Sequence, residues 1–288
     1  MNDYVIFADS GCDILPDKLG EWEVKTVDLL FRKEGEDREY TQAEMPTKDF
    51  YEKMRGGTVF RTSAANEASI RAAFEPVLRE GRDVLYVCFG SGLSGTAGTA
   101  KLTAEALERE FPGRKVIVID TLCASAGHGL ILRFAVQAKR NGASIEEAAA
   151  VVLEKRPNLC HWFTVDDLVY LKRGGRVSAA AAFFGGVLNI KPVLHVDDDG
   201  HLIPVIKVRG RINSIKAIAK KYTETALDPE NGTYFISHGD CLEDALKLER
   251  MLFEAHGKKA DLITDIGPVI GAHSGPGTLA LFFLGKQR

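Results

Sequence analysis

The sequence has no long hydrophobic run and no excess of one charge. Its longest nearly apolar stretch, Ala179 to Leu188, covers ten residues, whereas a membrane-spanning helix needs about 20. Lys and Arg number 37 against 40 Asp and Glu, a net charge of −3. No positive field is available to hold nucleic-acid phosphates or an anionic lipid surface. We therefore expect no nucleic-acid partner and no stable membrane insertion.

Cysteine is scarce, and the motifs of several metal and nucleotide enzymes are absent. The five cysteines are scattered, with no C-x-x-C pair, which is typical of reduced thiols. There is no H-E-x-x-H, no paired Cys/His spacing and no Walker lysine motif, so we expect no metal site and no P-loop. The first residues lack the basic and long apolar segments of a signal peptide. We expect a cytoplasmic protein.

Short β-branched runs alternate with segments of helical period, which is typical of an α/β fold with mainly parallel strands. In Asn66 to Glu80, the apolar residues Ile70, Phe74 and Val77 share one helical face. Ser144 and Glu147 have the spacing of a capping box and predict the start of another helix. Predicted strands are Tyr4–Ala8, Val84–Cys88, Val116–Ile119, Phe163–Val165, Thr233–Ser237 and Leu262–Thr264.

The length predicts two domains of about 150 residues each. The turn 156–158 follows a helix and precedes a strand, so we place an N-terminal, Rossmann-like domain with a mainly parallel sheet at 1–158. Within it, the segment of about 24–60 is charged and turn-like after one possible strand, Val24–Phe31, and predicts a small inserted subdomain. The remaining 159–288 forms a C-terminal α/β domain. An expected hairpin around His195–His201 gives it a mixed or antiparallel sheet.

The segment Gly90–Gly95 matches G-x-G-x-x-G, follows a strand and precedes a helical stretch. This is the context of a dinucleotide site, although the motif lies in the second βα unit and Asp120 comes 25 residues after Gly95. A helix N-terminus with the hydroxyls of Ser91, Ser94 and Thr96 suits a phosphate or a carboxylate. Anion binding is favoured over dinucleotide binding, and a plain tight turn is the third interpretation.

Three further segments carry candidate residues. Ser94, Asp240 and His273 follow the chain order of an α/β-hydrolase triad, but Thr96 replaces the second glycine of the nucleophile turn, which argues against a hydrolase. Thr62 and Ser63 precede a helix, where a hydroxyl is commonly an N-cap. His273 lies among four glycines and two prolines of segment 267–277, which predicts a rigid loop that positions something.

Taken in order, these segments resemble the DegV family, whose members include the fatty-acid-binding (FakB) subunits of bacterial fatty acid kinase. The resemblance covers nearly the whole chain, and the ordered set of motifs is far more specific than any single one. The resemblance rests on the segments Asp9–Asp13, Thr62–Ser63, Ser91–Thr96, Leu171–Arg176, Leu188–Pro192, Arg209–Gly210 and Ile266–Gly277. Two departures from the common pattern are Gly11–Cys12, in place of hydroxyl residues, and Ala97–Gly98, in place of a bulkier pair.

The resemblance implies a two-domain carrier, not a catalyst, that encloses one long-chain fatty acid such as palmitate, stearate or oleate between its domains. No covalent bond, catalytic residue, metal or cofactor is implied. A separate ATP-dependent fatty acid kinase would phosphorylate the presented carboxylate. The implied carboxylate ligands are Thr62, Ser94 and His273, with Ser63, Ser91, Gly95 and Arg176 nearby. We further expect Ala179–Leu188 either to line or gate the tail or to form an ordinary buried helix. The alternative function is an α/β enzyme that holds a phosphate or dinucleotide at Gly90–Gly95.

Overall fold

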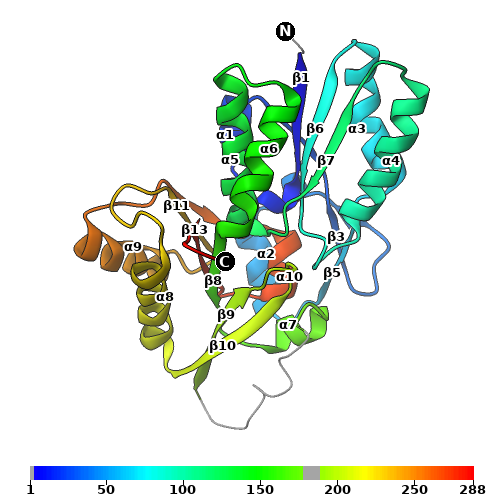
Figure 1. Ribbon diagram of the computed structural model, residues 1–288. Helices are drawn as coiled ribbons and strands as arrows, with labels where there is room; N and C mark the ends of the chain where they lie inside the picture. The colour runs from blue at the N-terminus through cyan, green and yellow to red at the C-terminus, as the bar shows by residue number, and fades with distance from the viewer. Residues whose placement is uncertain (1–2, 178–188) are drawn as a thin grey trace.

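The first half of the chain is built on a four-stranded parallel sheet. The computed structural model describes residues 3–177 and 189–288 (Figure 1). The strands stand in the order β2-β1-β6-β7, with bounds β1 Tyr4–Asp9, β2 Val24–Val27, β6 Asp83–Cys88 and β7 Val116–Asp120. The ends of β1, β6 and β7 lead into loops at the same sheet edge, because parallel strands share one direction. This edge faces the candidate site.

Both faces of this sheet are buried, which explains why its central strands are continuously apolar. Alternate residues of β1 pack into two different cores: Ile6 and Ala8 on one face, Val5 and Phe7 on the other. The first face is covered by the helices α1 Pro16–Glu21, α5 Ser125–Arg140 and α6 Ile145–Lys155. The second face is covered by α3 Glu67–Arg79 and α4 Thr96–Glu110 (Figure 1).

A small antiparallel sheet is inserted between β2 and α3. Its order is β4-β3-β5, with bounds β3 Leu30–Lys33, β4 Glu39–Tyr40 and β5 Phe60–Ser63. The helix α2 Thr47–Arg55 packs on it through Phe50, which meets Phe31 and Phe60 edge-on or tilted. This aromatic cluster fixes the end of β5, which carries Thr62.

The second half forms a six-stranded mixed sheet in the order β10-β9-β8-β13-β11-β12. Only β11 and β12 are parallel among its paired strands in the described residues. The bounds are β8 Leu159–Thr164, β9 Ile190–Val196, β10 Leu202–Arg209, β11 Tyr234–His238, β12 Leu262–Asp265 and β13 Leu279–Leu284. Helices α8 Arg211–Thr225 and α9 Leu242–His256 cover its outer face (Figure 1).

The helix α5 joins the two large sheets. Ten of its 16 residues are buried, because it packs against the parallel sheet on one side and against β8, β11 and β13 on the other. Leu130 and Phe282 therefore belong to one continuous core. A helix that is apolar around most of its circumference is a buried helix, and α5 places the two sheets so that a cavity remains beside its N-terminus.

The predicted fold class is confirmed: an α/β chain with a parallel sheet, a small inserted sheet and a mixed second sheet. With one exception, the strands and helices predicted above exist with ends shifted by a few residues, and the capping box of Ser144 is formed. The single possible strand Val24–Phe31 is wrong. It is two strands in different sheets, because the Leu29 N–H donates to Ser10 Oγ at 2.9 Å and turns the chain between them.

Two local predictions near the site are corrected. The N-cap of α3 is Asn66, whose side chain accepts from the Ser69 N–H, so Thr62 and Ser63 are not caps. Segment 267–277 is not a loop throughout, because Pro268 starts a short helix, α10 Pro268–Ser274. The segment Leu171–Arg176 begins inside another helix, α7 Val169–Gly174, which ends just before Gly175. Ala179–Leu188 lies outside the described residues.

Candidate ligand-binding site

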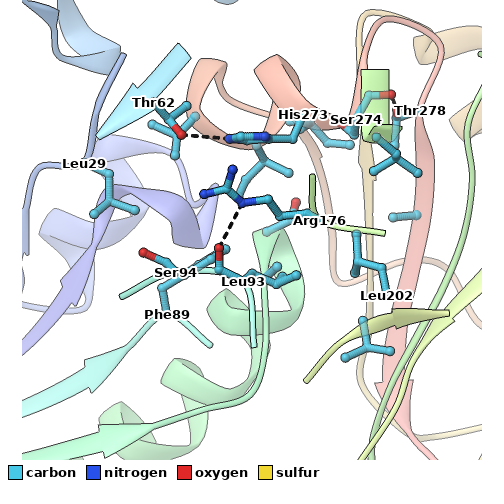
Figure 2. A pocket seen from close by; sticks show the side chains of 18 of the residues that line it. Leu29, Thr62, Phe89, Leu93, Ser94, Arg176, Leu202, His273, Ser274 and Thr278 are labelled. Carbon is cyan, nitrogen blue, oxygen red and sulfur yellow. Dashed lines mark hydrogen bonds between the residues drawn. The ribbon is translucent and has the colours of Figure 1, made fainter. Parts of the chain in front are cut away.

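A cavity lies where the three sheets meet, beside the N-terminus of α5 (Figure 2). The volume of the cavity is about 140 Å³. Its described lining is mostly apolar and comes from segments far apart in the sequence: Leu29, Thr62, Ser63, Ala64, Phe89, Leu93, Ser94, Gly95, Ala124, Ser125, His161, Phe163, Leu171, Arg176, Val196, Leu202, Ile266, Val269, Ile270, His273, Ser274, Thr278, Ala280 and Phe282.

One wall of the cavity is the inner face of the mixed sheet. Ala280 stands opposite Phe163, and Phe282 stands opposite His161, in the antiparallel pair of β13 and β8. All four line the cavity. The residues between them on β13, such as Leu281, pack in the outer core under α8 and α9. This alternation follows from the two-residue period of a strand and gives the cavity a flat apolar wall.

The polar end of the cavity is formed by Thr62 from β5 and His273 from α10. Thr62 Oγ1 lies 2.7 Å from His273 Nε2, a hydrogen bond between segments 211 residues apart. Figure 2 shows this pair on one side of the Arg176 guanidinium, and Leu93 and Ser94 on the other. Ser94 Oγ lies 2.9 Å from Thr96 Oγ1 and accepts from the Thr96 N–H. Hydroxyls and an imidazole therefore gather at one place on a mostly apolar surface.

Electrostatics at this end favour a neutral imidazole and an anionic ligand. Burial, and then the charges of Arg176 and Arg61, lower the pKa of His273 to about 4. The guanidinium of Arg176 is exposed and donates to the Leu93 carbonyl at 3.3 Å and to the Gly174 carbonyl at 2.6 Å. Its positive charge is therefore held at the edge of the cavity and is not neutralised by a carboxylate in these contacts.

The cavity brings together most of the residues that the sequence singled out. Thr62, Ser63, Ser94, Gly95, Arg176 and His273 all line it, whereas Ser91 does not belong to its described lining. Ser91 is exposed, and its N–H donates to the Asp120 carboxylate at 3.0 Å. That these residues bind a carboxylate stays a prediction, since their placement alone does not identify the ligand.

The hydrolase triad is not assembled. The Asp240 carboxylate pairs with Arg55, and the hydroxyl of Ser94 meets Thr96, while His273 meets Thr62. Nucleophile, base and orienting acid would have to be hydrogen-bonded in series, and they are not. The argument against a serine hydrolase therefore holds in three dimensions.

The glycine-rich turn Gly90–Gly95 packs closely against other segments of the chain. A Cβ on Gly92 would lie 2.6 Å from the backbone of Gly200, in the β9–β10 hairpin turn, and a Cβ on Gly90 would lie 2.8 Å from the Cys123 N. The carboxylate of Asp120, which would meet a ribose in a dinucleotide site, accepts instead from the Ser91 and Leu122 N–H groups. The turn is shaped by chain packing rather than by space for a pyrophosphate.

Four polar lining residues were missed: Ser125, His161, Ser274 and Thr278. Ser125 begins α5 just after β7, at the strand edge where α/β folds bind ligands, so this rule could have found it. Its hydroxyl lies 2.6 Å from the Asp13 carboxylate and 3.0 Å from Ser237 Oγ. His161 sits inside an apolar strand, where no sequence pattern marks it. Burial lowers its pKa well below the usual range.

The described residues hold no group of three or more His, Cys, Asp or Glu placed to bind a metal ion. Across the described ranges, no helix combines the length and the apolar character needed to cross a membrane.

A family model described as "Uncharacterised protein, DegV family" matches residues 3–286. The chain belongs to the DegV family. A DegV domain-containing protein of Clostridium perfringens is 39% identical over 289 residues, covering 100% of this chain and 99% of that protein. Similar solved structures include a DegV-family protein from Thermus thermophilus, described by its fatty acid binding, with a TM-score of 0.88, 28% identity, and coverage of 98% and 99% of the two chains.

A second similar solved structure comes from Thermotoga maritima and is described as revealing a fatty acid binding function. Its TM-score is 0.85 at 27% identity, and the likeness covers 99% of this chain and 100% of that one. Since both likenesses extend over nearly the full length, the DegV fold of this chain includes all three sheets that surround the cavity.

Proposed function

We propose that this protein binds one long-chain fatty acid, such as palmitate, stearate or oleate, without a covalent bond, in the cavity between its sheets. The observation that carries the proposal is an apolar cavity with the Thr62–His273 pair at one end. The fatty-acid-binding descriptions of the two similar solved structures support it. In this proposal the ligand lies between an N-terminal domain at 1–158 and a C-terminal domain at 159–288. The protein is a carrier and not a catalyst.

The carboxylate would lie against the hydroxyls of Thr62 and Ser94 and beside His273. A buried carboxylate is costly unless it is hydrogen-bonded or paired, and hydrogen bonds to a charged group are among the stronger ones. Arg176 adds a positive charge at the edge of the site. Ser63 and Gly95 line the same end of the cavity, so they belong to the surroundings of the carboxylate rather than to its direct ligands.

The apolar tail would supply most of the affinity. Each methylene of the tail that is buried contributes about 0.8 kcal/mol, so a tail of about 15 methylenes contributes roughly 12 kcal/mol before the costs of ordering and association. The mostly apolar lining suits such a hydrocarbon chain.

We further propose that the bound carboxylate is presented to a separate fatty acid kinase, which forms the acyl phosphate. Support comes from exposure: Arg176 and Arg61 are exposed at the polar end, whereas Phe163, Ala280 and Phe282 of the apolar wall are buried. A phosphoryl donor on another protein can approach the head group only from such an exposed end. Since this step needs ATP, we place the protein in the cytoplasm, with no cofactor of its own.

The test is mass spectrometry of the purified protein, native and then after organic extraction. One fatty acid per chain, released by extraction, is the expected result. Thr62→Val, which keeps the shape of the side chain but removes its hydroxyl, serves as the matched variant and should retain less. A protein that comes empty and takes up no added palmitate, stearate or oleate would overturn the proposal. Acyl phosphate formed from the loaded protein by a fatty acid kinase with ATP tests the presentation step.

A further inference from the structure

The two ring nitrogens of His273 have very different surroundings. Nε2 lies 2.7 Å from Thr62 Oγ1. Nδ1 is buried and has no hydrogen-bond partner among the described residues. A Cβ added to Gly174 would lie only 2.4 Å from this Nδ1. The hydrogen that occupies the Cβ direction on Gly174 Cα therefore points at Nδ1.

These surroundings decide which nitrogen carries the proton. Burial and two nearby guanidinium groups keep the pKa of His273 low, so the ring holds one proton near neutral pH. A proton on Nδ1 would leave a buried N–H without an acceptor, which native structures rarely tolerate. It would also face a C–H group, whereas a lone pair on Nδ1 makes a weakly favourable contact there. A proton on Nε2 forms a hydrogen bond, because Thr62 Oγ1 accepts it.

We propose that Gly174 is a positioning residue that holds His273 as the Nε2–H tautomer, so that His273 donates to Thr62 and the Thr62 hydroxyl donates to the fatty-acid carboxylate. The second half of this statement rests on the proposed function. With Nε2–H as donor, the oxygen of Thr62 is engaged as acceptor and its own O–H is free to turn to the ligand. His273 then acts on the carboxylate through Thr62, and its role is to orient and polarise that hydroxyl.

Gly174 cannot simply move away from the ring, because α7 is fixed on α10 at a second point. A Cβ on Gly275, just after α10, would lie 2.3 Å from the ring of Tyr170 in α7. The carbonyl of Arg173 at the end of α7 also accepts from Arg61 of β5, the strand that carries Thr62. These contacts hold the C-terminal end of α7 against His273, so a side chain at position 174 must displace the imidazole.

The first test reads the tautomer directly in the ligand-free protein. Uniformly ¹⁵N-labelled protein is examined by long-range ¹H–¹⁵N correlation near neutral pH, and His273 is assigned as the ring system missing from His273→Gln. We expect a protonated, pyrrole-type Nε2 and an unprotonated, pyridine-type Nδ1. A proton on Nδ1, or a doubly protonated ring near pH 7, would overturn the inference. Because no fatty acid is present, this result does not depend on the proposed function.

The second test uses two pairs of variants and palmitate affinity. Gly174→Ala should shift the His273 ring nitrogens and weaken binding about tenfold or more, whereas Gly98→Ala, whose Cβ meets nothing within 4 Å, should change neither. His273→Gln carries its amide near the former Nε2 and should bind about ten- to a hundredfold better than His273→Asn, whose amide lies near the former Nδ1. Equal binding of Gln and Asn variants would refute the relay through Thr62 even if Gly174→Ala fails to fold. Absence of binding by the wild-type protein would instead refute the proposed function.

Discussion

Chain-length selection can be tested at Ala280, a small residue in the apolar wall. Its Cβ lies on the cavity face of β13, opposite Phe163. Ala280→Leu adds three carbon atoms to a surface that the proposed tail covers. Because the cavity is bounded by packed strands and by α5, we expect the new side chain to occupy the space of about three methylene groups rather than to push the wall outward.

The expected effect follows from the hydrocarbon that is displaced. Three methylenes at about 0.8 kcal/mol each amount to about 2.4 kcal/mol, which corresponds to roughly a 50-fold weaker affinity for a chain that fills the cavity. A fatty acid about three carbons shorter should bind nearly as it does to the wild type, since its tail never reaches the blocked space. The ligand-free protein should be unchanged in stability or stabilised by up to about 2 kcal/mol, because part of an apolar cavity is filled.

The assay is a series of saturated fatty acids of increasing length, titrated against delipidated protein, with thermal unfolding as the stability readout. The matched control is Leu281→Ala, one residue along the same strand. Leu281 packs in the outer core under α8 and α9, so its truncation should lower the free energy of unfolding by about 2–5 kcal/mol and leave the order of chain preferences unchanged. An undiminished stearate affinity in Ala280→Leu would refute the placement of the tail along β13.

Three further outcomes test other parts of the structure. Thr62→Val should weaken fatty-acid binding about ten- to a hundredfold in calorimetric titration, and Thr62→Ser should restore most of it; equal affinities would remove Thr62 from the site. Ser144→Ala should lower the free energy of unfolding by about 1 kcal/mol in urea melts, because the capping box of α6 is lost, without changing ligand affinity. Burial lowers the pKa of His195 from 6.5 to about 4. As the pH falls, the unfolded chain therefore binds this proton before the folded chain does. The free energy of unfolding rises with pH between about 4 and 6.5, and the contribution of His195 is fully present above pH 6.5. His195→Asn, which keeps a donor for the His161 carbonyl, should remove roughly 3 kcal/mol of that rise, and an unaltered slope would contradict the assignment.

The fold could be predicted from local patterns where one face of an element is buried and the other exposed. The helical spacing of Ile70, Phe74 and Val77 predicts α3, because that helix buries only one face against the sheet. The same rule fails for the first half of α5, where every residue from Ser125 to Leu132 is buried. It also fails for β13, whose run Leu279–Leu284 is apolar on both faces because one faces the cavity and the other the outer core. Burial on both sides removes the alternation of apolar and polar residues from which an element is predicted.

The candidate site could be predicted in its residues but not in its connections. Thr62 and His273 stood out by motif, yet nothing in the sequence states that a hydrogen bond joins positions 211 residues apart. Ser91 stood out equally well and lies outside the described lining, because its N–H is used by Asp120 and the turn directs it to solvent. A motif identifies the loop that reaches a site, whereas the packing of neighbouring loops decides which of its side chains face the ligand.

Glycine patterns show why that second step needs three dimensions. A glycine is required wherever another group comes too close for a Cβ, and the sequence does not say whether that group is a ligand or the chain itself. At Gly92 the group is the backbone of Gly200, and at Gly174 it is the ring of His273. Both contacts lie where separate segments close around one cavity. The two glycine motifs, Gly90–Gly95 and Leu171–Arg176, therefore border the same cavity, because each permits its loop to approach a neighbouring segment closely, although the first had suggested a nucleotide.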